Sequence, residues 1–296
     1  MFQIFKEYSR AYSFWAIKRF SFAFQTLVFP CQCLKCRAYI NRKILDSLSA
    51  CFCDTCLPAD PLRFRPPFCP RCGHVFDQIS DQISDQISEL VSELVSDLVD
   101  DREIGKNHLC ETCLITPPLV NQVRAAFQYK GIIREAIPLF KYQSKLSLAR
   151  VFEAYMFDAF NLFFDRSSID LILPIPLHRK KMKQRGFNQS FILIRNFKKQ
   201  YKSVHGKNPP WQIDPGVLVR VKFTRPQTGF DIQQRKANLK GAFRIGKKSV
   251  KNRPISGKNI LLVDDVYTTG TTCGEAARLL LDAGANQVDV LVLARA

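Results

Sequence analysis

The second half of the chain alternates between two apolar patterns, one typical of buried strands and one typical of helices. The strand-like segments lie at 123–129, 169–176, 216–223, about 242–245, 259–264 and 287–295. The helical segments lie at 131–145, 147–164, about 188–201 and 272–283. Unbroken apolar strands that alternate with helices are typical of a parallel sheet covered on both faces. We therefore predict an α/β fold built on a parallel sheet.

The segment LLVDDVYTTGTT (261–272) ends an apolar strand on two aspartates and continues with threonines around Gly270. Ligands of parallel α/β sheets bind beyond the carboxyl ends of the strands. The backbone N–H groups and the dipole at a helix N-terminus favour a phosphate. Carboxylates can accept hydrogen bonds from a sugar diol or hold a divalent cation. A phosphorylated sugar with vicinal hydroxyls satisfies both demands, whereas a simple helix cap needs only one of these polar residues.

Positive charge is concentrated in one part of the chain. The 296 residues carry a formal net charge of +18. Residues 178–258 contain 22 lysines and arginines but only two acids, Asp214 and Asp231, a local charge of +20 that leaves the rest at 18 − 20 = −2. Such a block favours an anionic partner, namely phosphate, pyrophosphate or nucleic acid. The alternative is a solvated lysine-rich surface.

Ten of the eleven cysteines lie before residue 114. Eight of them form C-x-x-C pairs: Cys33 and Cys36, Cys53 and Cys56, Cys69 and Cys72, and Cys110 and Cys113. Two such pairs about 15 to 20 residues apart complete a structural zinc site of four thiolates. The first two pairs, with 16 residues between Cys36 and Cys53, fit this spacing, and Cys69 and Cys72 would share a second site with Cys110 and Cys113 across a longer insertion. We predict one or two zinc ions. Disulfides in a secreted protein are the alternative, which the regular spacing and the lack of a convincing signal sequence disfavour. Cys31 and Cys51 leave the ligand choice in the first clusters open, and Cys273 is interpreted as a core residue.

Two further segments stand apart. Residues 77–100 consist of six acidic tetrads, whose apolar stripe would drift around a helix by about 40° per repeat. We interpret them as a tolerated insertion, with an acidic partner-binding arm as the alternative. The leader 1–29 is aromatic and basic and has no apolar span of about 20 residues. We expect no stable membrane insertion and a cytoplasmic location, with weak attachment to a membrane surface as the minor alternative.

In combination, these features resemble the ComF family, which is associated with bacterial competence. Apart from the cysteine pairs, the resemblance is carried by the phosphoribosyl pyrophosphate (PRPP) signature LLVDDVYTTGTT and by the segments at 127–142, 173–190 and 224–243. It implies a type I phosphoribosyltransferase domain at 119–296. Before it would come a zinc-binding region at 30–118, interrupted by the insertion 77–100, and the leader 1–29.

The resemblance also implies roles for individual residues. Asp264 and Asp265 would contact the ribose hydroxyls of PRPP, and Arg185 and Arg235 complete the implied catalytic set. The 5′-phosphate would lie in the loop Thr268, Thr269, Gly270, Thr271 and Thr272. The implied pyrophosphate loop is Pro174, Ile175, Pro176, Leu177, His178 and Arg179. A mobile loop containing Arg225, Gln227, Thr228 and Asn238 would close over the substrate.

The implied activity is magnesium-dependent transfer of a phosphoribosyl group, with release of pyrophosphate, to an acceptor that the sequence does not identify. It would be linked to DNA uptake and natural transformation, with other competence proteins as partners. Two alternatives remain open. One is a non-catalytic adaptor that binds single-stranded DNA through its basic block. The other is a regulator that senses PRPP without turning it over.

Overall fold

The computed structural model describes residues 31–40, 47–58, 63–76, 107–142, 147–223, 239–246 and 255–296. The chain divides into two compact units, residues 1–59 and 60–296. The cysteine pairs at 33–36 and 53–56 belong to the smaller unit, whereas those at 69–72 and 110–113 share the larger unit with the sheet. The predicted boundary between 118 and 119 stays a prediction. The leader and the tetrad insertion lie outside the described residues.

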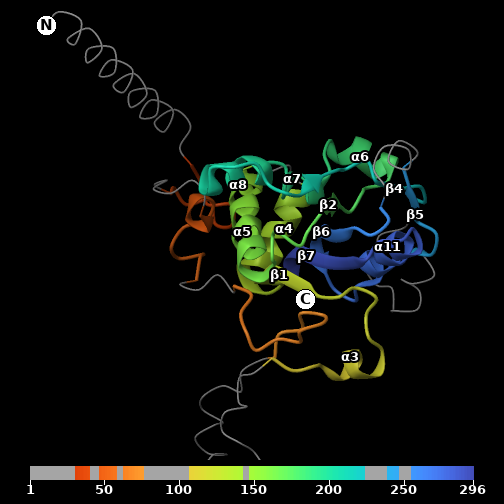
Figure 1. Cartoon of the computed structure of the whole chain (residues 1–296). Helices are drawn as coiled ribbons and strands as arrows, with labels where there is room; N and C mark the ends of the chain where they lie inside the picture. The colour runs from red at the N-terminus through yellow and green to blue at the C-terminus, as the bar shows by residue number, and fades with distance from the viewer. Residues whose placement is uncertain are drawn as a thin grey trace, which may run out of the picture. The chain divides into compact units, whose positions relative to one another are not determined.

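The larger unit is built on a five-stranded parallel sheet, which confirms the predicted fold class (Figure 1). Its strand order is β1-β7-β6-β2-β3. The strands are β1 (Val123–Gln128), β2 (Leu171–Pro174), β3 (Gln212–Ile213), β6 (Asn259–Tyr267) and β7 (Gln287–Arg295). The two long central strands, β6 and β7, are buried at almost every position, which is why their sequences are nearly continuous apolar runs.

Helices cover both faces of the sheet. Figure 1 shows α4 (Gly131–Tyr142) and α5 (Ser147–Phe163) on one side of β7 and α11 (Thr271–Asp282) on the other. Alternate side chains of the strands, such as Ile260 and Leu262, form one core cluster with Ala276 and Leu280 of α11. The other helices within the described residues of the larger unit are α3 (Glu111–Ile115), α6 (Arg179–Arg185), α7 (Gln189–Ile192) and α8 (Phe197–His205), and the smaller unit contains the 3-10 helix η1 (Leu48–Ala50). Among the described residues, no helix combines the length and apolar character that a membrane crossing requires.

Several elements differ from their predicted form. The strand predicted at 216–223 is β4 (Leu218–Arg220), which pairs antiparallel with β5 (Phe243–Ile245) as a separate ribbon instead of joining the parallel sheet. The edge of the parallel sheet beside β2 is instead formed by β3, which pairs parallel with β2. The helix predicted at about 188–201 is two helices, α7 and α8.

The structure also contains a helix that apolar periodicity could not reveal, because α6 has the sequence RKKMKQR. Its ends supply the missing signal. His178 precedes it as an N-cap and accepts a hydrogen bond from the Lys180 N–H, and Gly186 follows it in the left-handed conformation with φ 78°. Caps at both ends stabilise a helix that buries no side chain.

Candidate functional site

The two aspartates of the signature lie within β6, three and two residues before its end at Tyr267. Asp265 forms an ion pair with Lys141 at the end of α4, with 2.7 Å between Nζ and Oδ1. Asp264 accepts hydrogen bonds from the Ser190 hydroxyl at 3.0 Å and from the Asp265 N–H at 2.9 Å. The strand thus continues past the point predicted as its end, and contacts from α4 and α7 hold the two carboxylates.

The buried surroundings of the site shift the pKa values of Asp264 and Lys141. Burial raises the pKa of Asp264 to about 7, and the neighbouring Asp265 carboxylate adds to this effect. Burial alone would lower the pKa of Lys141, but the charge of Asp265 outweighs it and raises that pKa. Lys141 therefore remains charged beside Asp265. Asp264 instead exchanges its proton near neutral pH, so its charge responds to whatever binds next to it.

Asp264→Asn is expected to make the protein more stable than wild type at about pH 8, with the difference shrinking towards about pH 5. The folded state keeps the Asp264 proton after the unfolded chain has lost it. This carboxyl group therefore costs stability as the pH rises from 3.8, the ordinary pKa of an aspartate, to about 7. Thermal unfolding across this pH range measures the difference.

Asp170→Asn is the matched control, with the opposite expected sign. The Asn259 N–H and Lys258 lower the pKa of Asp170, so its charge stabilises the folded state above the usual Asp range. Its asparagine variant should lose stability relative to wild type as the pH rises through that range. A stability difference for Asp264→Asn that does not change with pH would contradict the assignment.

The predicted phosphate loop spans a turn and the start of α11. Thr268 and Thr269 lie in the turn, Gly270 is the N-cap with φ 74°, and Thr271 and Thr272 are the first helical residues. The hydroxyls of Thr269 and Thr271 lie 2.8 Å apart and are exposed. A long helix that begins with a glycine and small hydroxylic residues offers free N–H groups to an anion.

The predicted pyrophosphate loop lies beside this strand end. The Ile175 N–H donates to the Val263 carbonyl at 2.8 Å, directly before the acidic pair. The Asn188 side chain donates to the Ile175 carbonyl at 3.1 Å and so ties the turn to α7. From Pro174, the last residue of β2, the turn continues through Pro176 and Leu177 to the His178 cap and Arg179.

The predicted arginines have different outcomes. Arg185 ends α6, and its guanidinium carbon lies 4.6 Å from the ring centroid of Tyr142, the neighbour of Lys141 in the chain. The structure therefore brings Arg185 to the side of the site where Lys141 binds Asp265. Arg235 and the mobile-loop residues Arg225, Gln227, Thr228 and Asn238 lie outside the described residues, between β4 and β5.

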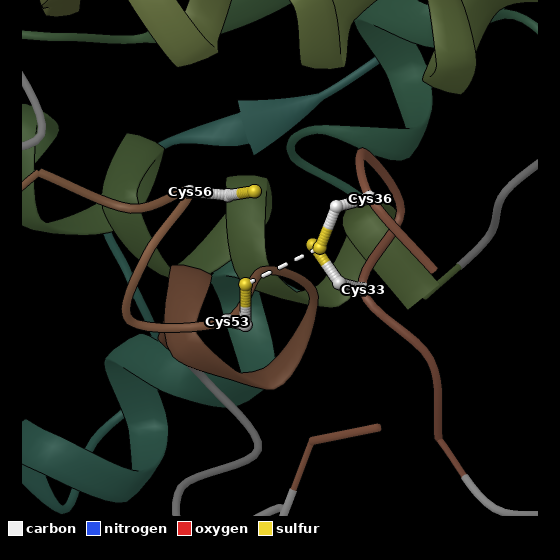
Figure 2. A group of neighbouring side chains, drawn as sticks. All are labelled: Cys33, Cys36, Cys53 and Cys56. Atoms are coloured by element: carbon white, nitrogen blue, oxygen red, sulfur yellow. Dashed lines mark hydrogen bonds between the residues drawn. The ribbon is translucent and has the colours of Figure 1, made fainter. Parts of the chain in front are cut away.

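The structure gathers the eight predicted cysteine ligands into two groups of four. In each group the sulfur atoms lie within 4.8 Å of one another. Figure 2 shows the first group, Cys33, Cys36, Cys53 and Cys56, with 3.5 Å between the sulfurs of Cys36 and Cys53. In the second group, the sulfurs of Cys72 and Cys110 are 3.6 Å apart. Tetrahedral thiolates at about 2.3 Å from zinc lie roughly 3.8 Å from each other, so both groups fit this ion.

The first cysteine of each group has the surroundings of a thiolate. Burial would raise the pKa of Cys33, but the N–H groups of Lys35, Cys36 and Cys53 outweigh it and lower this pKa to about 6. Equivalent N–H groups, from Arg71, Cys72 and Cys110, lower the pKa of Cys69 to about 7 against the effect of burial. Each group could therefore bind one zinc ion.

The other cysteines are not ligands of these groups. Cys31 and Cys51 belong to neither, which answers the ligand choice that the sequence left open. Cys273 is 2% exposed and part of the core cluster, in agreement with its interpretation as a core residue.

Metal analysis of protein purified under reducing conditions should find two zinc ions per chain. Replacing Cys110 and Cys113 by serine should reduce the content to one, and so should replacing Cys53 and Cys56, because a pair of thiolates binds zinc far more weakly than four do. Unchanged zinc content in either double variant would contradict the assignment of that group.

The sequence reasoning missed Lys141, Ser190 and Arg295. Lys141 follows Ile133 and Ile137 at intervals of four, so it lies on the buried stripe of α4. A lysine at such a position needs a buried partner, so the periodicity of the sequence could have indicated Lys141 as a site residue. No comparable local signal marks Ser190 or Arg295, whose partners lie 74 and 223 residues away in the chain.

Known proteins share these features. Residues 218–296 match the family model described as phosphoribosyl transferase domain. The chain is 30% identical over 195 residues to the DNA utilization protein YhgH of Escherichia coli K12, covering 64% of this chain and 79% of that protein. It is 28% identical over 190 residues to competence protein F of Haemophilus influenzae, covering 63% and 78%.

A third relative matches a shorter part of the chain. Competence protein ComFC of Bacillus subtilis is 26% identical over 169 residues, which cover 56% of this chain and 60% of that protein. The matched domain, the parallel sheet and the paired cysteine groups agree with one another, and on this basis the chain belongs to the ComF family.

Proposed function

We propose that this protein binds PRPP together with Mg²⁺ and transfers its phosphoribosyl group to an acceptor, with release of pyrophosphate. One observation carries the proposal. Three segments lie together at the carboxyl ends of the strands: the acidic pair of β6, the turn 268–270 before α11 and the turn 174–178 after β2. They offer partners for a ribose diol, a 5′-phosphate and a pyrophosphate, the three polar parts of PRPP.

In this function each part of the site has a separate task. Asp264 accepts hydrogen bonds from the ribose hydroxyls, while Lys141 fixes the orientation of Asp265. The N–H groups around Gly270 and the first turn of α11 bind the 5′-phosphate. The carboxylates of Asp264 and Asp265 would help to hold Mg²⁺, which would neutralise charge on the pyrophosphate.

The reaction breaks the bond between the anomeric carbon and the pyrophosphate oxygen, and the electron pair leaves with pyrophosphate. The acceptor supplies the electron pair of the new bond and gives up a proton. Because negative charge grows on the departing pyrophosphate, cations near the turn 174–178 stabilise the transition state. Arg179 at the start of α6 and Arg185 at its end supply such charge.

Calorimetry of the zinc-loaded wild-type protein with PRPP and Mg²⁺, at moderate salt, tests this proposal. Binding of one PRPP per chain, together with much weaker binding when Mg²⁺ is withheld, is the expected result. Pyrophosphate release in the presence of candidate acceptors would then establish transfer. A well-folded protein that binds no PRPP would overturn the proposal.

A second candidate function, binding of single-stranded DNA, is favoured by the basic helix α6. Arg179, Lys180 and Lys183 are exposed on it, and it contains no acidic residue. This function predicts DNA binding that weakens steeply with salt and survives the loss of Asp264 and Asp265. A PRPP-sensing regulator predicts PRPP binding without pyrophosphate release from any acceptor. The DNA function is also compatible with transfer, and filter binding at several salt concentrations measures it.

A further inference from the structure

The second cysteine group is built directly onto the sheet. The Arg71 carbonyl, between two of the cysteines, accepts the Val123 N–H of β1 at 2.8 Å. The Arg124 guanidinium donates to the Pro70 carbonyl at 2.9 Å. A Cβ added to Gly73 would lie 2.7 Å from the Val123 carbonyl oxygen, so the backbone after Cys72 packs against β1 as closely as a glycine permits.

Arg295, near the end of β7, connects this group to the strand that carries the acidic pair. Its Nε donates to the Cys72 carbonyl at 2.9 Å, and its Nη1 donates to the Tyr267 carbonyl at 3.4 Å. The guanidinium carbon lies 5.2 Å from the centroid of the Tyr267 ring. A planar guanidinium can hold two carbonyls and an aromatic face at once, which a lysine cannot do.

Tyr267 in turn supports the phosphate loop. Its side chain is buried, with 6% exposure, and lies directly beneath Gly270. A Cβ added to Gly270 would overlap the tyrosine hydroxyl, and it would lie 2.5 Å from Cζ. The position of the Tyr267 ring therefore sets the position of the turn before α11.

One cavity is lined both by the second cysteine group and by the phosphate loop. Cys72, Cys110 and Cys113 line it together with residues 268–271. All of these residues belong to the larger compact unit. The cysteine group and the loop are thus neighbours in space, and Arg295 and Tyr267 are the described side chains that link them.

We propose that the second cysteine group positions the phosphate loop through Arg295 and Tyr267, so that metal bound to this group controls the affinity for a sugar 5′-phosphate. The proposal rests on the proposed function, since it assigns the loop to that phosphate. The pairs 69–72 and 110–113 come from distant parts of the chain, and a shared ion would hold them together. Without the ion, the position of the Cys72 carbonyl, which accepts from the Arg295 Nε, would depend only on the contacts of residues 70–73 with β1.

The first cysteine group provides the matched control. It has the same four-thiolate composition but belongs to the smaller compact unit. The test compares two double variants of the full chain. The second-group pair carries Cys110→Ser and Cys113→Ser, and the first-group pair carries Cys53→Ser and Cys56→Ser. Arg295→Ala and the milder Arg295→Lys break the connection without replacing a metal ligand. Because Nη2 of Arg295 also donates to the Cys72 Sγ at 4.0 Å, zinc content is measured on both variants, and circular dichroism confirms that each protein is folded.

Two measurements are made on every variant: amide hydrogen exchange in peptides covering 268–272, and calorimetry with ribose 5-phosphate. Arg295→Ala and the second-group pair should both speed exchange in the loop about ten-fold and weaken ribose 5-phosphate binding about ten-fold. Arg295→Lys should give a smaller effect of the same sign while zinc content stays at the wild-type level. The first-group pair should change neither measurement.

If amide hydrogens in the loop of Arg295→Ala or of the second-group pair exchange at the same rate as in wild type, the inference is overturned. Equal effects of the two cysteine pairs would also overturn it, because they would reveal a general loss of stability. If wild type binds no ribose 5-phosphate or PRPP, the proposed function fails. The exchange measurement, which needs no ligand, still decides whether the cysteine group positions the loop.

Discussion

Replacing both Asp264 and Asp265 by asparagine is expected to abolish PRPP binding in calorimetry, a loss of roughly 100-fold or more. A hydrogen bond to a charged group contributes about 1.5–3 kcal/mol, and two such groups are lost together. Asparagine also cannot supply the negative charge that helps hold Mg²⁺. The sugar 5′-phosphate loop is left intact, so ribose 5-phosphate should lose less affinity than PRPP with Mg²⁺.

The controls separate this effect from a loss of folding. Asp265→Asn leaves the Lys141 ammonium, whose side chain is 20% exposed, without its ion-pair partner, and this destabilises the protein. A third change, Lys141→Met, removes that cation and should recover stability without restoring PRPP binding. Asp282→Asn, at the exposed end of α11, should bind PRPP like wild type. Normal PRPP affinity in the double variant would mean that the carboxylates are not the sugar site.

Gly270→Ala is expected to weaken binding of ribose 5-phosphate by on the order of 10- to 100-fold. Alanine at φ 74° is strained, at a cost of about 1–3 kcal/mol, and its Cβ would overlap Tyr267. Because Tyr267 is buried and held by Arg295, the loop has to move instead. That movement displaces the N–H groups that would bind the phosphate. Calorimetry and chemical denaturation measure affinity and stability on the same variant.

Gly274→Ala, four residues further along α11, is the matched control. Its Cβ would meet no atom within 4 Å, and the residue is helical. Alanine should therefore stabilise the protein by about 0.5–1 kcal/mol and leave ribose 5-phosphate binding unchanged. Wild-type affinity in Gly270→Ala would show that the phosphate does not bind at this turn.

The sequence by itself determined the features that depend on local periodicity and spacing. Apolar runs such as 287–295 predicted strands of a parallel sheet covered on both faces, because a strand buried on both faces has no polar side. The C-x-x-C spacing predicted the two groups of four cysteines, since a tight turn directs both thiolates of a pair to one point. The fold class and the composition of the metal groups follow from such short-range rules.

Only the tertiary structure decided which side chains meet. Periodicity places Lys141 on a buried face but does not say that Asp265 lies opposite it. The contacts between Ser190 and Asp264, and between Arg295 and Cys72, join residues that are 74 and 223 positions apart. The pairing of β4 with β5 as a separate antiparallel ribbon was likewise not predicted from the sequence. The reason is physical: local sequence fixes which face of an element is apolar, whereas the packing of all elements together fixes what that face contacts.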